Sequence, residues 1–213
     1  MKEKLIKYKS ILIPLCIVAI QGLTYLLIKP FQHNIHMLSS TIDKSIPFIN
    51  YSVFIYSSWY VLLFLVPYLL YKKDKNMLGK YIATYIICII IADITFIIYP
   101  TGVIRPELSN DNIVNMLMNF IYLIDTPAIN CLPSMHCAVS MLFILTIICS
   151  NKFNIKTKSW ITLLSILIML STLTTKQHVL IDLITGNLLM TIIFLYVNNN
   201  KKLVNKTKKM LNI

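Results

Sequence analysis

The chain has 213 residues, of which 57% are hydrophobic and only 13% are charged. Charged residues make up about a quarter of a typical soluble domain, and a soluble fold of this size could not bury so much apolar side chain. This composition excludes an ordinary soluble globule, and the four glycines exclude a collagen-like or low-complexity chain. We expect an all-α, polytopic integral membrane protein that forms a single domain over residues 1–213.

Six hydrophobic runs follow one another along the chain, each close to the roughly 20 residues that a membrane-spanning helix needs. They cover residues 10–28, 47–71, 81–99, 134–150, 159–173 and 179–197. The first run has a basic start like a signal peptide, but it is long and has no small-residue cleavage site, which favours a retained anchor. The pattern predicts six transmembrane helices.

The net charge of +12 comes from lysines in four clusters, at residues 2–9, 72–80, 152–158 and 201–209. With six spans, all four clusters lie on the same side of the membrane, and an excess of basic residues marks the cytoplasmic side. Both termini are therefore predicted to be cytoplasmic. The charge is explained by topology and by attraction to anionic lipid, so we expect the lipid bilayer as a partner and no nucleic acid.

The connection between the third and fourth runs, residues 100–133, is too long for a simple turn. Within it, Ile113, Leu117, Ile121 and Ile124 recur at helical spacing on one face. Some thirteen residues of this kind, ending before Pro127, are too short to span a bilayer. They predict an amphipathic helix on the outer membrane surface.

Arg105 is the only arginine in the chain and lies in the same outer connection. A guanidinium binds a phosphate group through two parallel hydrogen bonds, which a lysine cannot do. One arginine taken alone is equally well explained as a surface residue without a role.

His136 stands at the beginning of the fourth run, after Pro133 and Ser134. Proline suits the first turn of a helix, and the free amide groups that follow would form an anion site at the outer face. The alternative is a capping serine beside a hydrated interfacial histidine.

His178 and Asp182 are four residues apart at the beginning of the sixth run, so helical spacing places them on one face together with Gly186. A carboxylate inside a span is costly and is usually paired. The pair predicts a carboxylate that fixes the imidazole tautomer and leaves the second nitrogen free as a nucleophile or base. A purely structural polar pair between helices is the alternative. Asp93, another intramembrane carboxylate, is given no catalytic role.

The topology, derived from the lysines alone, places Arg105, His136, Lys176 and His178 together at the outer interface. The segments that hold these residues resemble the type 2 phosphatidic acid phosphatase superfamily, particularly its branch similar to inositolphosphotransferases and sphingomyelin synthases. The resemblance rests on residues 42–48, 99–101, 105–106, 133–136 and 171–186, with a motif region of about 93–187. It implies six transmembrane helices and three motifs that meet at one membrane face.

The resemblance also implies a role for each matched residue. Arg105 and Ser134 would bind phosphate, His136 would protonate the leaving oxygen, and His178 would attack phosphorus while Asp182 orients it. The chemistry would be a metal-independent lipid phosphatase reaction through a phosphohistidine, with no cofactor. We find no metal-ligand cluster at helical or loop spacing.

The chain departs from the phosphatase pattern at three positions, Ile98, Met135 and Thr172. The first and third replace a basic residue, and Lys176 is a candidate for the missing cation. The residues that still match are His136, His178 and Asp182, and these are shared with the transferase branch. A lipid head-group phosphotransferase is therefore the alternative function.

Two further classes stay open: a transporter and a catalytically inactive membrane scaffold. The lipid substrate, the acceptor (water or an alcohol) and the oligomeric state are not specified by the sequence. We expect a bacterial cell-membrane protein whose active site faces the extracytoplasmic side.

Overall fold

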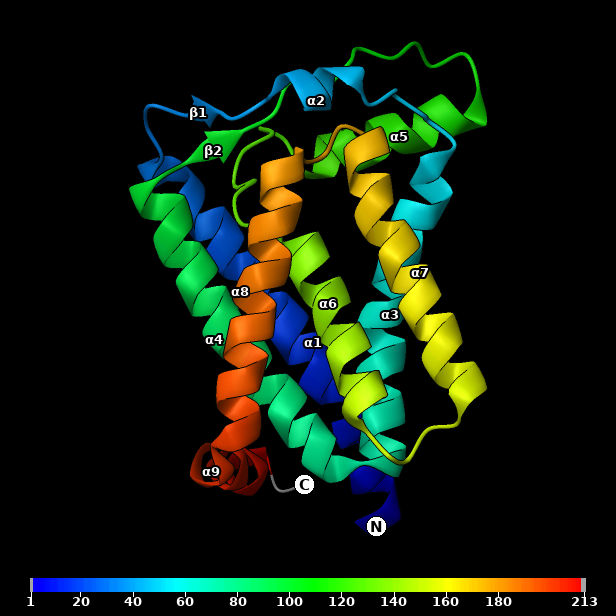
Figure 1. Cartoon of the computed structure of the whole chain (residues 1–213), viewed down its shortest axis with the longest axis vertical. Helices are drawn as coiled ribbons and strands as arrows, with labels where there is room; N and C mark the ends of the chain where they lie inside the picture. The colour runs from blue at the N-terminus through cyan, green and yellow to red at the C-terminus, as the bar shows by residue number, and fades with distance from the viewer. Residues whose placement is uncertain (1, 212–213) are drawn as a thin grey trace.

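The structure is a computed structural model that describes residues 2–211, with side chains from residue 15 onward. It is mostly helical (Figure 1). In chain order its elements are α1 (Lys2–Ile28), the 3-10 helix η1 (Lys29–Phe31), β1 (His36–Met37), α2 (Thr41–Ser45), α3 (Ser52–Lys73), α4 (Lys75–Ile98), β2 (Thr101–Gly102), α5 (Ile113–Ile124), α6 (Met135–Cys149), α7 (Ile155–Thr174), α8 (Leu180–Asn199) and α9 (Lys201–Leu211).

Within the described part of the chain, four helices are long and apolar enough to cross a membrane: α3, α4, α7 and α8. The chain is therefore a membrane protein. The helix α6 is shorter, with 15 residues, and α1 is apolar over its described side chains, from Leu15 onward. Figure 1 shows α1 and α6 running beside the four long helices. The count of six spans stays a prediction.

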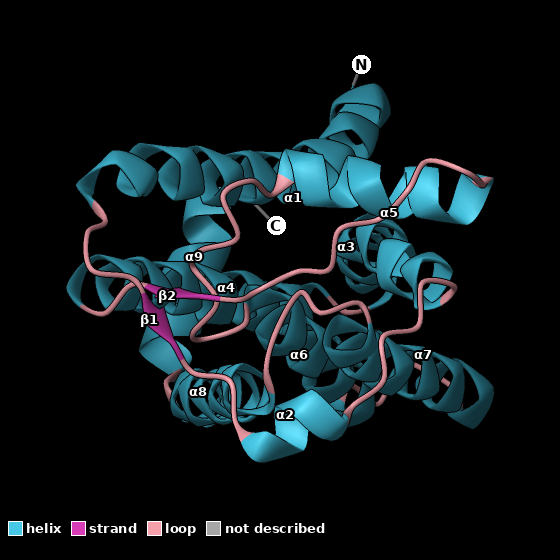
Figure 2. Ribbon diagram, turned by 90° about the horizontal axis from the view of Figure 1, so that it is seen from above, coloured by secondary structure: helices cyan, strands magenta, loops and turns pink. Residues whose placement is uncertain are grey.

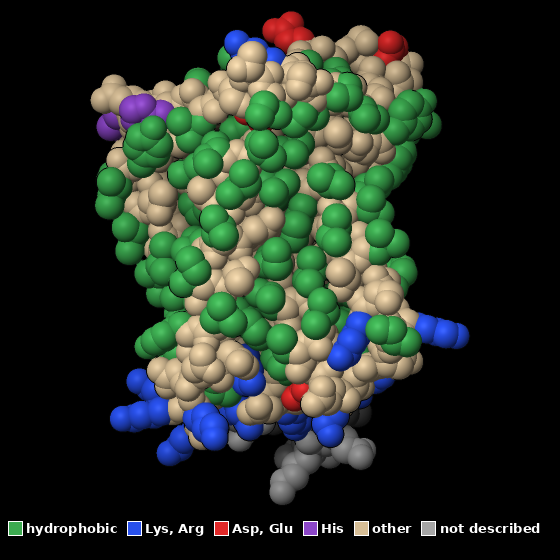
Figure 3. All heavy atoms as spheres, viewed as in Figure 1, with side chains coloured by type: hydrophobic (Ala, Val, Ile, Leu, Met, Phe, Trp, Pro, Cys, Tyr) green, Lys and Arg blue, Asp and Glu red, His purple; other side chains and the backbone are tan. Residues whose placement is uncertain are grey.

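The chemical character of the surface changes along the length of the bundle (Figure 3). Apolar side chains cover the middle, while Lys and Arg side chains gather at the end where α9 lies. The acidic side chains at the opposite end in this view lie near the short elements and connections. An apolar band between polar ends is the surface that a bilayer requires.

The helix α6 forms the centre of the bundle and packs against α3, α4, α7 and α8. Its residues Cys137, Ala138 and Val139 are fully buried. Small side chains at such positions let neighbouring helices approach closely. The core is therefore arranged around the helix whose first turn carries His136.

The connections at the end opposite α9 fold into a layer over the bundle (Figure 2). The strands β1 and β2 pair in parallel, with His36 opposite Thr101 and Met37 opposite Gly102. The helix α2 begins with a capping box, in which Ser40 and Asp43 exchange hydrogen bonds with each other's backbone amides. The helix α5 lies across the ends of the long helices (Figures 1 and 2), so the predicted amphipathic helix in this connection is present.

Candidate active site

The loop between α7 and α8 positions His178 one residue before the α8 cap. The backbone amides of Gln177 and His178 both donate to the Thr172 carbonyl, at 3.0 and 3.1 Å. His178 Nδ1 lies 3.3 Å from Asp182 Oδ2, and the same oxygen accepts from the Val179 amide at 3.0 Å. Asp182 is fully buried. The predicted pair is thus formed, and its hydrogen bond leaves His178 Nε2 available for chemistry.

The beginning of α6 lies directly against α8. The Ser134 amide donates to the Asp182 carbonyl at 3.1 Å, and the Ser134 hydroxyl accepts from the Cys137 amide at 3.3 Å. A Cβ placed on Gly186 would collide with the Ser134 carbonyl oxygen. Glycine is therefore required where α8 meets α6, and this close contact sets the spacing between the two histidine-bearing segments.

His136 and His178 face one another, with ring centroids 5.7 Å apart. His136 is surrounded by aromatic residues of α3: its Nε2 lies 2.8 Å from the Tyr56 hydroxyl, and its ring centroid is 4.4 Å from that of Trp59. Sequence analysis did not single out Tyr56, because α3 reads as one continuous apolar helix. The two predicted histidines are brought together.

Arg105 is held in a partly buried polar network behind the histidine loop. Its guanidinium pairs with the Asp125 carboxylate and the Gln177 side-chain carbonyl, and it donates to the backbone carbonyls of Tyr122 and Asp125 at 3.3 and 3.2 Å. Its carbon Cζ lies 4.9 Å from the Tyr122 ring centroid. Burial raises the pKa of Tyr122 to about 12, so this hydroxyl is neutral and donates to the Thr175 carbonyl at 2.7 Å.

Two donors of this network are buried without a partner among the described residues: Arg105 Nε and Gln177 Nε2. Buried polar groups are usually paired, and phosphate oxygens are strong acceptors for both. Gln177 was not among the predicted site residues. The signal that could have found it is its position immediately before His178.

Lys176 is turned toward α2. Its ammonium group donates to the carbonyls of Asp43 and Ile46, at 3.0 and 2.5 Å, and its backbone has a positive φ of 53°. Asp43 in turn accepts from the Leu180 amide at 2.7 Å. The structure therefore shows Lys176 as part of a clamp between α2 and the beginning of α8, and its role as a phosphate ligand stays a prediction.

Asp43 remains charged in this clamp. Burial alone would raise the pKa of its carboxyl group, but hydrogen bonds from Ser40 and Leu180, with the nearby Lys176 charge, lower that pKa below its ordinary value of 3.8. The ionised carboxylate stabilises the amino end of α8, where the helix dipole favours a negative charge.

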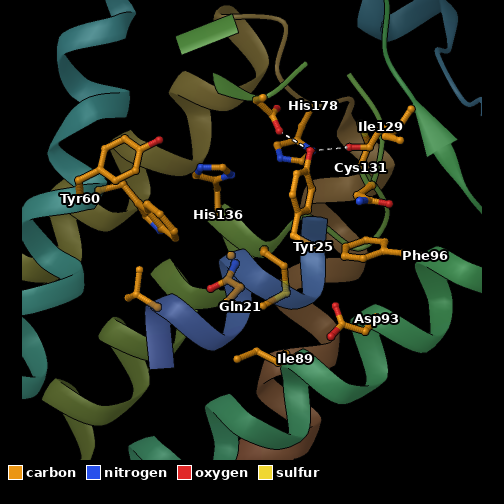
Figure 4. A pocket seen from close by; sticks show the side chains of 16 residues that line it. Gln21, Tyr25, Tyr60, Ile89, Asp93, Phe96, Ile129, Cys131, His136 and His178 are labelled. Carbon is orange, nitrogen blue, oxygen red and sulfur yellow. Dashed lines mark hydrogen bonds between the residues drawn. The ribbon is translucent and has the colours of Figure 1, made fainter. Parts of the chain in front are cut away.

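The two histidines line a cavity of about 200 Å³ between α1, α3, α4 and α6. Figure 4 shows the rings of His136 and His178 side by side at one end of it, with Gln21, Asp93 and Ile89 toward the other. His178 also lines a second pocket of about 310 Å³, together with Lys176 and Asp43. His178, the candidate nucleophile, is thus accessible both from the interior of the bundle and from the layer of connections that covers the end of the bundle.

One potential metal-ligating group is present at the site. Cys131, His178 and Asp182 each offer a ligand atom, and the three atoms lie within 4.8 Å of one another. Thiolate, imidazole and carboxylate are all zinc ligands. Burial and the charge of Asp182 raise the pKa of the Cys131 thiol, so an ion would have to displace its proton. Spacing in the sequence did not predict this group, because Cys131 lies in the connection before α6.

A family model described as the PAP2 superfamily matches residues 31–196 of the chain. The match includes every residue described above as part of the site except those that α1 contributes to the cavity. No curated protein and no solved structure matches the chain significantly.

Proposed function

Because the chain belongs to the PAP2 superfamily, whose members act on phosphorylated substrates, we propose that it is a membrane phosphatase for a lipid phosphate or diphosphate. The observation that carries this proposal is the histidine pair in one cavity, with His178 on the buried Asp182. A lipid head-group phosphotransferase that uses the same residues is the second candidate, supported by the departures at Ile98 and Thr172.

The proposed reaction has two steps. In the first, His178 Nε2 attacks phosphorus, the bond between phosphorus and the alcohol oxygen breaks, and His136 gives its proton to the departing alkoxide. In the second, His136 takes a proton from water, whose oxygen attacks phosphorus and releases His178. The Tyr56 hydroxyl, hydrogen-bonded to His136, keeps that ring oriented through both steps.

Negative charge on the phosphoryl oxygens needs donors that are already in place. We assign this role to Arg105, to Gln177 Nε2, which has no partner among the residues that the structure describes, and to the first amides of α6, whose cap is Ser134. Asp182 balances the positive charge that forms on His178 during attack. Each of these assignments is a proposal for this chain.

We also propose the orientation in the membrane. The lysine-rich end with α9 faces the cytoplasm because basic residues accumulate on that side, and both ends of the chain lie there in Figure 1. The histidines then lie near the extracytoplasmic face. Six spans satisfy this arrangement, with α1 and α6 as the two additional crossings.

The first experiment measures phosphate release from a panel of lipid phosphates, with a chelator present. Purified wild type is compared with His178→Ala and with His33→Ala, a matched control on an exposed histidine of the outer connection. We expect release from wild type and His33→Ala and none from His178→Ala. Full activity of folded His178→Ala would exclude the nucleophile assignment.

A second measurement separates the two candidate functions. The same preparation receives an excess of alcohol acceptors, and transfer of the phosphate-bearing group is followed beside its release. Turnover that depends on an alcohol and on His178 would establish the transferase. Turnover without an added alcohol would establish the phosphatase.

A further inference from the structure

The cavity below the histidines has one wall outside the segment that matches the family. Val18, Gln21, Gly22 and Tyr25 of α1 all line it, whereas the match begins at residue 31. Gly22 and Tyr60 are exposed on α1 and α3 while also lining the cavity. The cavity therefore opens sideways between these two neighbouring helices, toward the hydrocarbon of a surrounding bilayer.

The lining is apolar in large part, as a lipid chain requires, but it also contains polar groups at the depth of the bundle. Asp93 lies five residues before the end of α4 and faces the cavity (Figure 4). Among the described side chains, no Lys, Arg or His nitrogen lies within 4.0 Å of its carboxylate. An intramembrane carboxylate is costly and usually marks a functional position.

Hydrogen-bond donors line the same cavity as the Asp93 carboxylate. Gln21 lines the same end of the cavity, and because its carbonyl accepts from the Tyr85 hydroxyl, its N–H groups are left for other partners. Trp59 Nε1 and Asn130 Nδ2 are buried and have no partner within the described chain. A pure hydrocarbon in the cavity would leave Trp59 Nε1 and Asn130 Nδ2 unsatisfied, at a cost for each, whereas Asp93 already has the Thr24 side chain as a hydrogen-bond partner.

We propose that this cavity binds the lipid part of the substrate, and that Asp93 with Gln21 selects a lipid that carries a hydrogen-bond donor, such as a free hydroxyl, on the part of its chain that reaches the end of the cavity away from the histidines. The proposal rests on the lipid-phosphate chemistry assigned above. A hydroxyl group both donates and accepts, so it satisfies Asp93 and Gln21 together. A polyprenyl phosphate and a fully esterified glycerol phosphate offer no donor there. Sites built to hydrogen-bond a substrate hydroxyl discriminate strongly against analogues that lack it.

Binding can be measured without turnover, because the chain has only two tryptophans. Trp160 is 52% exposed on α7, so Trp160→Phe leaves the buried cavity residue Trp59 as the sole indole reporter. In the His178→Ala background, we expect a 1-acyl-glycerol 3-phosphate with a brominated chain to quench Trp59 fluorescence saturably. Failure of the brominated lipid to quench Trp59 would overturn the cavity assignment.

Gly22→Phe tests the wall formed by α1. A Cβ on Gly22 meets nothing within 4 Å, so the ring can enter the cavity without displacing a neighbour. We expect this variant to lose the quenching, whereas Leu23→Phe, a matched change at an exposed neighbouring position, keeps it. Equal quenching in both variants would place the lipid elsewhere.

Selectivity is tested with two single-chain lipid phosphates that differ only in one hydroxyl, which is placed on the acyl chain rather than beside the phosphate. We expect wild type to prefer the hydroxyl-bearing lipid by about tenfold or more in kcat/KM, and Asp93→Leu to lose this preference while its thermal stability in detergent is maintained. Equal rates in wild type, or an unchanged preference in Asp93→Leu, would overturn the selection by Asp93. If no lipid phosphate is turned over at all, the proposed function fails, while quenching of Trp59 still reports on the cavity.

Discussion

Asp182→Asn is the most informative perturbation of the proposed site because it removes one charge and changes almost no volume. In the structure, Oδ2 is bonded to His178 Nδ1 and to the Val179 amide, at 3.3 and 3.0 Å. The other oxygen, Oδ1, is buried without a partner among the described residues. An asparagine can place its oxygen at only one of these positions, and each choice has a calculable cost.

If the oxygen stays at the Oδ2 position, both hydrogen bonds persist and the amide NH₂ is buried without a partner, which costs about 1–3 kcal/mol of stability. The positive charge on the attacking imidazole then lacks its carboxylate. Hydrogen bonds to charged groups contribute about 1.5–3 kcal/mol, which corresponds to roughly a 10- to 150-fold lower kcat. If the NH₂ instead faces His178, the ring must carry its proton on Nε2 and cannot attack, and a loss of about 10⁴-fold is the precedent for a wrong tautomer.

The assay is the initial rate of phosphate release by purified, monodisperse protein, with the melting temperature in detergent recorded for each variant. Asp111→Asn is the matched control, since this aspartate is fully exposed on the outer connection. We expect at least a tenfold lower kcat for Asp182→Asn and no change for the control. A folded Asp182→Asn protein with the wild-type kcat would refute the argument that the carboxylate acts through His178.

Three more outcomes follow from the geometry. Arg105→Lys keeps the charge but cannot reproduce the forked hydrogen bonds, so the inhibition constant for orthophosphate should rise about tenfold or more; an unchanged constant would contradict a phosphate-binding role. The low pKa of Asp43 adds stability above pH 3.8, and this stability is lost as pH falls through the pKa of the folded state. The thermal stability of Asp43→Asn should therefore decline less than that of wild type between pH 5 and 3. Parallel curves of melting temperature against pH for the two proteins would contradict this. Gly186→Ala should cost about 1–3 kcal/mol of stability and lower activity, because its Cβ collides with the Ser134 carbonyl; wild-type melting and rate would show that α6 and α8 can separate freely.

The parts of the site that could be predicted from the sequence are those defined by local spacing. His178 and Asp182 are one helical turn apart, so their pairing follows from the geometry of a helix. The amphipathic repeat predicted α5, and apolar runs predicted the long helices α3, α4, α7 and α8. These inferences needed no knowledge of how the helices pack against each other.

The rest depends on contacts between segments far apart in the chain. Tyr56 reaches His136 only because α3 packs against α6. Gln177 belongs to the site because its side chain is hydrogen-bonded to Arg105, which lies in another connection. The expectation for Lys176 considered only its charge and its neighbour His178. The carbonyls that surround its ammonium group belong to α2, which no periodicity in the sequence connects to this loop.

The clamp between α2 and α8 has a consequence for biosynthesis. Asp43 leaves the ribosome well before its partner amide, on Leu180, which lies 137 residues later in the chain. Chains of this kind are synthesised and inserted from the amino end. The layer of connections at this end is therefore fastened over the candidate site only when α8 arrives, and a nascent or truncated chain without α8 lacks the helix on which α2 docks. The pairing of His178 with Asp182 at the candidate site is therefore completed only after the first turn of α8 has been made.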